Sequence, residues 1–340
     1  MDTAILKKEK LGAFLKSLNA TRLIAPVAKK GKTSFEVIAD PAAATFDLND
    51  YSASPKKVVF PQTETLFAFK RQKDNLTVAP ADQADVTVVF GIRPCDARSF
   101  VILDRLFDGD FKDPYYLNKR EQTLLIGLAC TEPTNRCFCP SLGGSPASEE
   151  GLDMLFSDIG DEYYISLLTE RGRKAHVQAA ALVTEPTTEQ RAKKDQADKK
   201  ALAKIRRQVS LDGIHEKLPR IFESDVWKEL ANKCLGCGIC TYYCPTCHCF
   251  DIQDEGDVTE GRRIRVWDSC MFEEFTRHTS GANPRHSRAE RLRNRVLHKF
   301  SYYPNNLGYI ACVGCGRCIE MCPVNEDIIE ILDRVRELNE

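Results

Sequence analysis

Two runs of cysteine towards the C-terminal end of the chain have the type and spacing of metal ligands. Both follow the pattern C-x2-C-x2-C-x3-C-P, which binds cubane iron–sulfur clusters. Thiolates are soft ligands suited to such clusters. The two-residue gaps let the chain curl so that three sulfurs meet one face of a cluster. The runs are Cys234, Cys237, Cys240 and Cys244 before Pro245, and Cys312, Cys315, Cys318 and Cys322 before Pro323.

The fourth cysteine of each run predicts a crossover between two clusters, because in two-cluster ferredoxins it ligates the cluster of the other run. We therefore expect two [4Fe–4S] clusters. Structural zinc is the alternative, since C-x2-C pairs also bind zinc. Zinc needs only four ligands and does not account for a duplicated run that ends in proline. The predicted ligands are Cys234, Cys237, Cys240 and Cys322 (set 1) and Cys312, Cys315, Cys318 and Cys244 (set 2).

Four further cysteines in the first half form a second constellation. Two of them follow runs that are typical of buried strands, at 86–90 and 123–128. If these strands are adjacent and parallel, Cys95 and Cys130 reach the same edge of the sheet. Such a group predicts a third [4Fe–4S] cluster, with a zinc site or free buried thiols as the alternatives. The four residues are Cys95, Cys130, Cys137 and Cys139 (set 3).

Three cysteines remain, and they lie in or after the segment that follows the first run. Cys247 and Cys249 flank His248 immediately beyond Cys244, and Cys270 comes later. They could tune a cluster through S–H contacts, replace a predicted ligand, or form a further site. Buried structural thiols are the plain alternative.

The composition excludes several classes of protein. The 340 residues carry a formal net charge of −1 and 43% hydrophobic residues, as in an ordinary soluble protein without a field that attracts nucleic acid. No signal peptide, twin-arginine signal or membrane-spanning run is recognisable. We therefore expect a cytoplasmic protein that binds neither membrane nor nucleic acid, with its fifteen cysteines used mainly as metal ligands.

Changes in pattern along the chain predict an α+β protein. Residues 1–185 read as a mixed α/β domain, with an amphipathic helix near the start, short β-rich runs that include 57–60, and a helix over 97–107. Residues 186–212 form a charged helical linker. Residues 213–340 read as an α-helical dicluster ferredoxin domain, because the 67 residues between the runs are too many for a compact ferredoxin.

An arginine-rich segment lies between the two runs. Residues 283–299 carry six Arg or Lys residues and one acidic residue. A helix of this kind beside a cluster would donate hydrogen bonds and raise the reduction potential. It could also bind an acidic partner, and a solvated helix face is the plain alternative.

The chain resembles a known family in both halves. The similarity lies in the segments 91–98, 130–139, 234–247, 267–270 and 312–318. These resemble the iron–sulfur subunit shared by cytoplasmic sulfhydrogenases (beta subunit) and anaerobic sulfite reductases (A subunit), with relatives beside heterodisulfide-reductase-type flavin complexes. The resemblance implies a helical ferredoxin domain, a third cluster, and an electron-carrying role beside a flavin- and NAD(P)H-binding subunit.

These observations favour an electron-transfer subunit over an enzyme. No G-x-G-x-x-G follows a strand and no P-loop is present, so we expect no flavin or NAD on this chain itself. No catalytic residue is assigned. The expected partners are a flavin- and NAD(P)H-binding reductase subunit and a hydrogenase, sulfite reductase or heterodisulfide-reductase-type subunit. The alternatives are a catalytic iron–sulfur reductase with a substrate site near Cys247, Cys249 and Cys270, and a zinc-stapled binding module.

Overall fold

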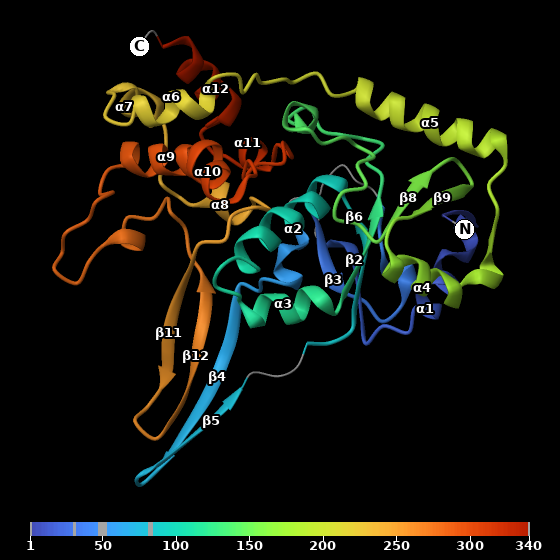
Figure 1. Cartoon of the computed structure of the whole chain (residues 1–340), viewed down its shortest axis with the longest axis horizontal. Helices are drawn as coiled ribbons and strands as arrows, with labels where there is room; N and C mark the ends of the chain where they lie inside the picture. Colours follow the sequence, from blue (N-terminus) through green and yellow to red (C-terminus); the bar gives the residue numbers. More distant parts are fainter. Residues whose placement is uncertain (1, 30–31, 47–52, 81–83, 339–340) are drawn as a thin grey trace.

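An eight-stranded mixed sheet is the centre of the N-terminal half of the computed structural model, which describes residues 2–29, 32–46, 53–80 and 84–338 (Figure 1). The strand order is β10-β1-β9-β8-β7-β6-β2-β3. The pairs β2–β6, β6–β7 and β7–β8 are parallel, and the remaining pairs are antiparallel. The strands are β1 Thr3–Lys7, β2 Arg22–Lys29, β3 Lys32–Val37, β6 Thr87–Ile92, β7 Thr123–Leu128, β8 Met154–Asp158, β9 Glu162–Leu167 and β10 Val183–Thr184.

The predicted strands around the third cysteine set are confirmed. Every residue of β6 and of β7 is buried, as expected for parallel strands covered on both faces. They pair directly, with Val88 opposite Leu124 and Val89 opposite Leu125. The helices of this half are α1 Leu11–Ser17, α2 Pro94–Phe107, α3 Pro114–Glu121, α4 Glu170–Gln178 and α5 Thr188–Ala203. The predicted helix at 97–107 is therefore α2, which begins three residues earlier at a proline.

Short helices build the C-terminal half around a second hydrophobic core. Leu218, Trp227, Val296 and Leu332 are among its buried side chains. The arginine-rich helix begins at a capping box, in which Ser287 and Glu290 each bond the other's backbone N–H. The helices are α6 Ile214–Arg220, α7 Val226–Leu230, α8 Ile239–Tyr242, α9 Arg288–Leu297, a π-helix at His298–Tyr302, α10 Tyr303–Leu307, α11 Arg317–Glu320 and α12 Ile328–Glu337.

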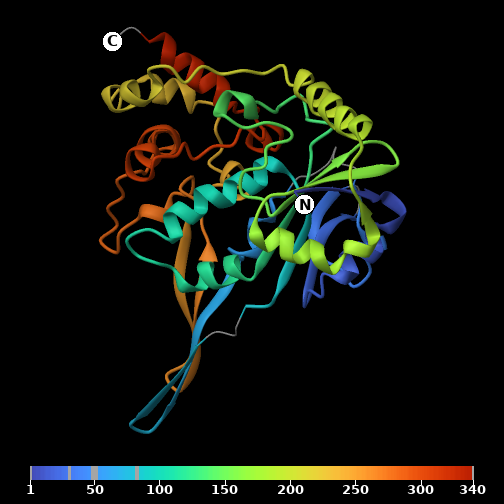
Figure 2. The same cartoon turned by 45° about the vertical axis from the view of Figure 1, so that its right-hand side comes forward.

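A second, four-stranded sheet extends away from the body of the molecule (Figure 2). Its order is β11-β12-β4-β5, so it takes two strands from each half of the chain. The purely helical prediction for 213–340 is wrong here, because β11 and β12 form an antiparallel hairpin in the middle of that region. The strands are β4 Thr63–Gln72, β5 Asn75–Pro80, β11 Phe250–Gly256 and β12 Glu260–Trp267.

Of two further predictions near the N-terminus, one is confirmed only in part and the other is wrong. The first segment contains strand β1 before its short helix α1, because Ile5 and Leu6 pair with β10 on one side and with β9 on the other. The run at 57–60 is not a strand, because Pro55–Val58 form a 3₁₀ turn capped by the Ser54 hydroxyl, which accepts a hydrogen bond from the Lys56 N–H at 3.3 Å.

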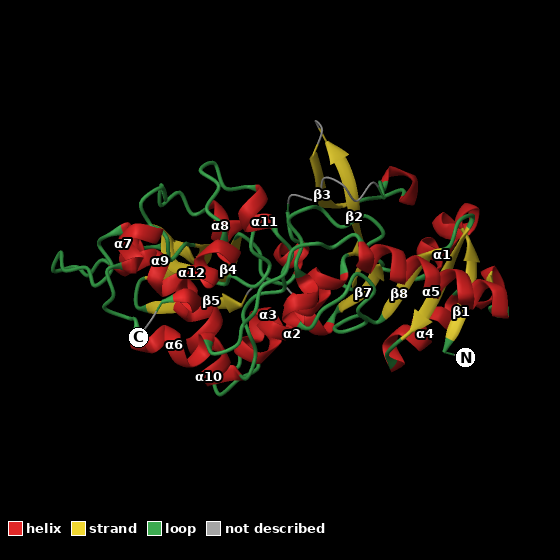
Figure 3. Ribbon diagram, turned by 90° about the horizontal axis from the view of Figure 1, so that it is seen from above, coloured by secondary structure: helices red, strands yellow, loops and turns green. Residues whose placement is uncertain are grey.

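The two halves lie side by side (Figure 3). Phe138 and Leu142, in the loop that carries part of set 3, are buried in the hydrophobic core of the C-terminal half. The helix of the predicted linker at 186–212 is α5, which ends at Ala203 and lies against β8 and β9. No helix in the described ranges is long and apolar enough to cross a membrane.

Candidate iron–sulfur centres

The two cysteine runs have the same backbone conformation. Each carries glycines in the left-handed region on both sides of its second cysteine: Gly236 and Gly238 have φ of 69° and 73°, and Gly314 and Gly316 have φ of 65° and 74°. Residues with a side chain rarely adopt this backbone conformation, so glycine at these positions permits the tight curl of each loop. The curl turns a backbone N–H onto the first cysteine of each run, from Gly236 to Cys234 Sγ at 3.4 Å and from Gly314 to the Cys312 thiol.

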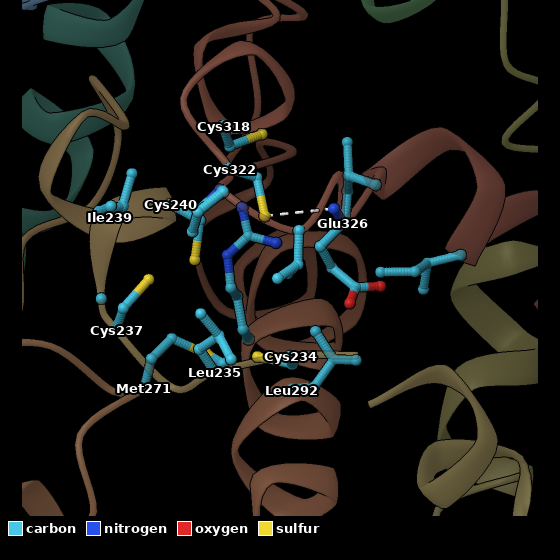
Figure 4. A pocket seen from close by; sticks show the side chains of 16 residues that line it. Cys234, Leu235, Cys237, Ile239, Cys240, Met271, Leu292, Cys318, Cys322 and Glu326 are labelled. Atoms are coloured by element: carbon cyan, nitrogen blue, oxygen red, sulfur yellow. Dashed lines mark hydrogen bonds between the residues drawn. The ribbon is translucent and has the colours of Figure 1, made fainter. Parts of the chain in front are cut away.

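Set 1 surrounds one cavity (Figure 4). All four of its cysteines line this cavity, although Cys322 comes from the other run. The backbone N–H of Glu326 donates to Cys322 Sγ at 3.2 Å. Apolar side chains such as Leu292 and Ile331 form much of the remaining wall. The structure therefore brings together the four residues that the crossover pattern predicts.

Set 2 surrounds a neighbouring cavity. It is lined by all four cysteines of the set, including Cys244 from the first run. Cys318 lines this cavity and the cavity of set 1 as well. Two groups of four thiols therefore lie side by side in one small region.

Two buried cations face these thiols. Arg295 lines both cavities and hydrogen-bonds the Cys318 thiol, while its Nε has no hydrogen-bond partner among the described residues. Lys299 lies in the π-helical turn after α9 and donates from Nζ to Cys244 Sγ at 3.3 Å. A [4Fe–4S] cluster with four thiolate ligands is anionic, so buried cations and an unpartnered N–H fit this group.

The thiols of sets 1 and 2 are suited to binding metal, because they do not readily ionise without it. Burial raises the pKa of Cys240 and of Cys312 to about 11, so neither ionises near neutral pH without a strong electrophile. Metal coordination deprotonates a thiol outright. Burial opposes the charge on Lys299, but the sulfurs of Cys244 and Cys247 outweigh it and raise the pKa of this ammonium.

Set 3 is only partly gathered in the structure. Cys130, Cys137 and Cys139 lie near one another, and burial, with repulsion from the other two sulfurs added to it, raises the pKa of Cys139 to about 12. Cys95, on the first turn of α2, packs instead on the same small apolar cluster as Cys315. The charge of Arg93 acts on both Cys95 and Cys130, so one cation influences both parts of the set.

The loop of set 3 is docked directly on the second cysteine run. Phe138 N–H donates to Gly314 O at 2.9 Å, and Cys137 Sγ lies 3.8 Å from Cys315 O. A side chain at Gly314 would meet the Cys139 backbone at 2.6 Å. This close approach brings the third thiol group against set 2.

Replacing Gly314 with alanine tests this contact. Gly308 is the matched control, because its φ of 75° is also left-handed but a Cβ there would meet nothing within 4 Å. Both substitutions should cost about 1–2 kcal/mol of backbone strain. Gly314→Ala should cost about 1–3 kcal/mol more from overpacking. Urea unfolding of the two variants measures the difference, and equal midpoints would contradict the docking.

Each of the three remaining cysteines hydrogen-bonds another cysteine. The Cys247 thiol hydrogen-bonds Cys244, and the Cys270 thiol hydrogen-bonds Cys249. Lys56 Nζ donates to the carbonyls of Cys244 and Cys247 at 2.9 and 2.8 Å, and burial lowers its pKa.

Sequence reasoning missed Lys56 and Lys299 as individual residues of the site. Lys56 lies 188 residues from Cys244, and no local pattern marks it. Lys299 ends the arginine-rich segment, whose charge was the available signal. The same segment supplies Arg288, which donates to the Cys234 carbonyl at 2.7 Å. The prediction that this segment lies beside a cluster site is consistent with these contacts.

Comparison with known proteins fits this geometry. The family model of the 4Fe-4S dicluster domain matches residues 233–326, which contain both cysteine runs. Over 317 residues the chain is 31% identical to Sulfhydrogenase 2 subunit beta of Pyrococcus furiosus, covering 93% of this chain and 92% of that protein. The chain belongs to the sulfhydrogenase beta subunit family. These matches confirm the predicted family and the [4Fe–4S] type of cofactor. The cysteines of set 3 lie outside the residues that the dicluster model matches.

Proposed function

We propose that the chain is an electron-transfer subunit of a multi-subunit oxidoreductase that relays single electrons through three [4Fe–4S] clusters. The observation that carries this proposal is the succession of thiol groups. Set 1 and set 2 line neighbouring cavities that share Cys318, and the loop of set 3 docks on set 2 at Gly314. Cubane clusters exchange one electron at a time, and close succession suits a relay.

The proposed partners follow from the fact that such a relay carries electrons one at a time. A flavin- and NAD(P)H-binding subunit handles electron pairs and would exchange them one by one with the first cluster. A hydrogenase, a sulfite reductase or a heterodisulfide-reductase-type subunit would lie at the other end. The identity of the relative as a sulfhydrogenase subunit supports a hydrogenase-type complex.

Metal analysis of the full chain tests the proposal. Protein purified without oxygen should contain about twelve iron atoms and matching sulfide, four for each of three clusters. EPR of the reduced protein should show interacting cubane signals, because the sets lie close together. Stoichiometric zinc with negligible iron would overturn the relay, and about eight iron atoms would remove the third cluster from it.

Lys299→Met tests the role of the buried ammonium. A positive charge beside a cluster stabilises its more negative, reduced state, so its removal should lower the reduction potential of the set 2 cluster. We expect a fall of about 60 mV, equivalent to a tenfold change for one electron. EPR-monitored titration measures it. Lys299→Arg should restore most of the potential, and Lys193→Met, an exposed change on α5, should leave it unchanged. An unchanged potential in Lys299→Met would contradict this role.

A further inference from the structure

One pair of thiols outside the three sets is held together by the base of a β-hairpin. The first pair of residues in β11 and β12 places Phe250 opposite Trp267. Cys249 precedes this pair, and its carbonyl accepts a hydrogen bond from Asp268 N–H at 2.9 Å. The turn that follows brings the thiol and the backbone N–H of Cys270 onto Cys249. Their sulfurs are therefore neighbours, although 21 positions separate them in the sequence.

The pair lies within electrostatic reach of Cys247, a thiol that borders the set 2 ligand Cys244. Cys247 hydrogen-bonds Cys244, is acted on electrostatically by Cys249, and itself acts on Cys270. A third thiol therefore lies near both the set 2 ligand Cys244 and the pair. Cys270 is buried and Cys249 is partly exposed. One end of the pair is thus open to solvent and the other is enclosed.

Two buried ammonium groups favour negative charge at this place. Lys56 Nζ lies 4.2 Å from the Trp267 ring centroid, and both Lys56 and Lys299 act electrostatically on Cys249. The hydrogen bond from the Cys270 thiol has the largest effect in favour of negative charge on the Cys249 sulfur, and the Cys270 N–H and the two ammonium groups add to it. A thiolate is the form of cysteine that forms and exchanges disulfides.

We propose that Cys249 and Cys270 form a redox-active dithiol that opens and closes as a disulfide by exchanging electrons with the neighbouring clusters. On closing, an S–S bond forms between the two sulfurs, two S–H bonds break and two protons leave. The two electrons pass singly to two oxidised [4Fe–4S] clusters, those of set 2 and set 1. On opening, two reduced clusters return the electrons and the sulfurs take up two protons. The pair thus couples two-electron to one-electron chemistry, and this role rests on the proposed relay.

Other roles for these cysteines predict different results. Within the described parts of the chain, no three His, Cys, Asp or Glu side chains converge where one metal ion could be held. A cluster ligand at Cys249 or Cys270 would show as loss of iron on substitution. A purely structural thiol pair would remain as two thiols at every potential.

Mass spectrometry of the full, cluster-loaded chain tests the dithiol. Samples poised without oxygen at a series of potentials are quenched in acid, alkylated and digested. At high potential the peptides of Cys249 and Cys270 should be linked, and at low potential both cysteines should be alkylated. The ratio should change tenfold per about 30 mV, as expected for two electrons. Two unlinked thiols across the whole series would overturn the proposal.

Reductive titration of variants provides a second measurement. Cys249→Ser and Cys270→Ser should each take up two electrons fewer per chain than the unaltered protein, with the same iron content. Cys247→Ser is the matched control and should keep the linked peptide and the full electron count. Equal electron counts in all four proteins, or iron loss in Cys249→Ser or Cys270→Ser, would overturn the dithiol. Failure of the relay itself would be separately visible, because the unaltered chain would then lack iron.

Discussion

Replacing Arg317 with methionine is expected to destabilise the protein by about 3–5 kcal/mol, because it leaves a buried carboxylate without its partner. Arg317 lies in the second cysteine run and forms a two-pronged ion pair with Asp96, with N–O distances of 2.7 and 2.6 Å. Their side chains are 5% and 0% exposed. Asp96 lies beside Cys95 on α2, so the pair joins the third thiol group to the second run.

A double substitution separates the cost of a broken pair from the value of an intact one. Asp96→Leu together with Arg317→Met removes both charges, and such replacements are often neutral or stabilising. The double variant should therefore recover most of the loss of the single variant. Arg136→Met is the exposed control: its pair with Glu320 has side chains 39% and 58% exposed and should contribute at most about 1 kcal/mol.

Urea midpoints at equal iron content provide the comparison, because a chain with cofactors and two cores does not unfold in one two-state step. Arg317→Met should unfold at clearly lower urea than Arg136→Met. Equal midpoints for these two variants would show that the buried pair does not join the halves. A double variant as unstable as Arg317→Met would show that shape, rather than charge, is lost at this contact.

Local signals predicted the parts of the molecule that depend on neighbouring residues. The spacing of the two runs predicted both ligand groups, and the structure brings each group to one cavity. The strands β6 and β7 were predictable because each is a continuous apolar run. The arginine-rich segment 283–299 contains helix α9, which begins at the capping box of Ser287.

The parts that were missed depend on distant contacts or lack a pattern. Every residue of β11 is exposed, and its alternation of apolar and polar residues ends after Ile252, too soon to predict a strand of seven residues. The segment around Ile5 and Leu6 fits a helix period, but sheet pairing on both sides makes it a strand. The thiol pair of Cys249 and Cys270 depends on the same hairpin, so its geometry could not be predicted without β11 and β12.

If the fourth cysteine of each run ligates the cluster of the other run, pairs of cysteine substitutions should damage either one cluster or two. This is the second prediction with a large expected effect. Cys322 and Cys240 belong to different runs but line one cavity, whereas Cys315 lines the other. Cys240→Ser with Cys322→Ser should therefore disable one cluster, because both changes act on the same group. Cys315→Ser with Cys322→Ser should disable two.

Iron analysis and EPR spin counts without oxygen distinguish these outcomes. If a cluster that loses a ligand is released, the first double variant should keep about eight of about twelve iron atoms and the second about four. If each run instead held its own cluster, the two results would be exchanged. Cys247→Ser, which removes a thiol beside Cys244 without entering either set, should keep all the iron. The exchange of results is decisive because both double variants remove two thiols and share Cys322→Ser, so general loss of stability cannot reverse their order.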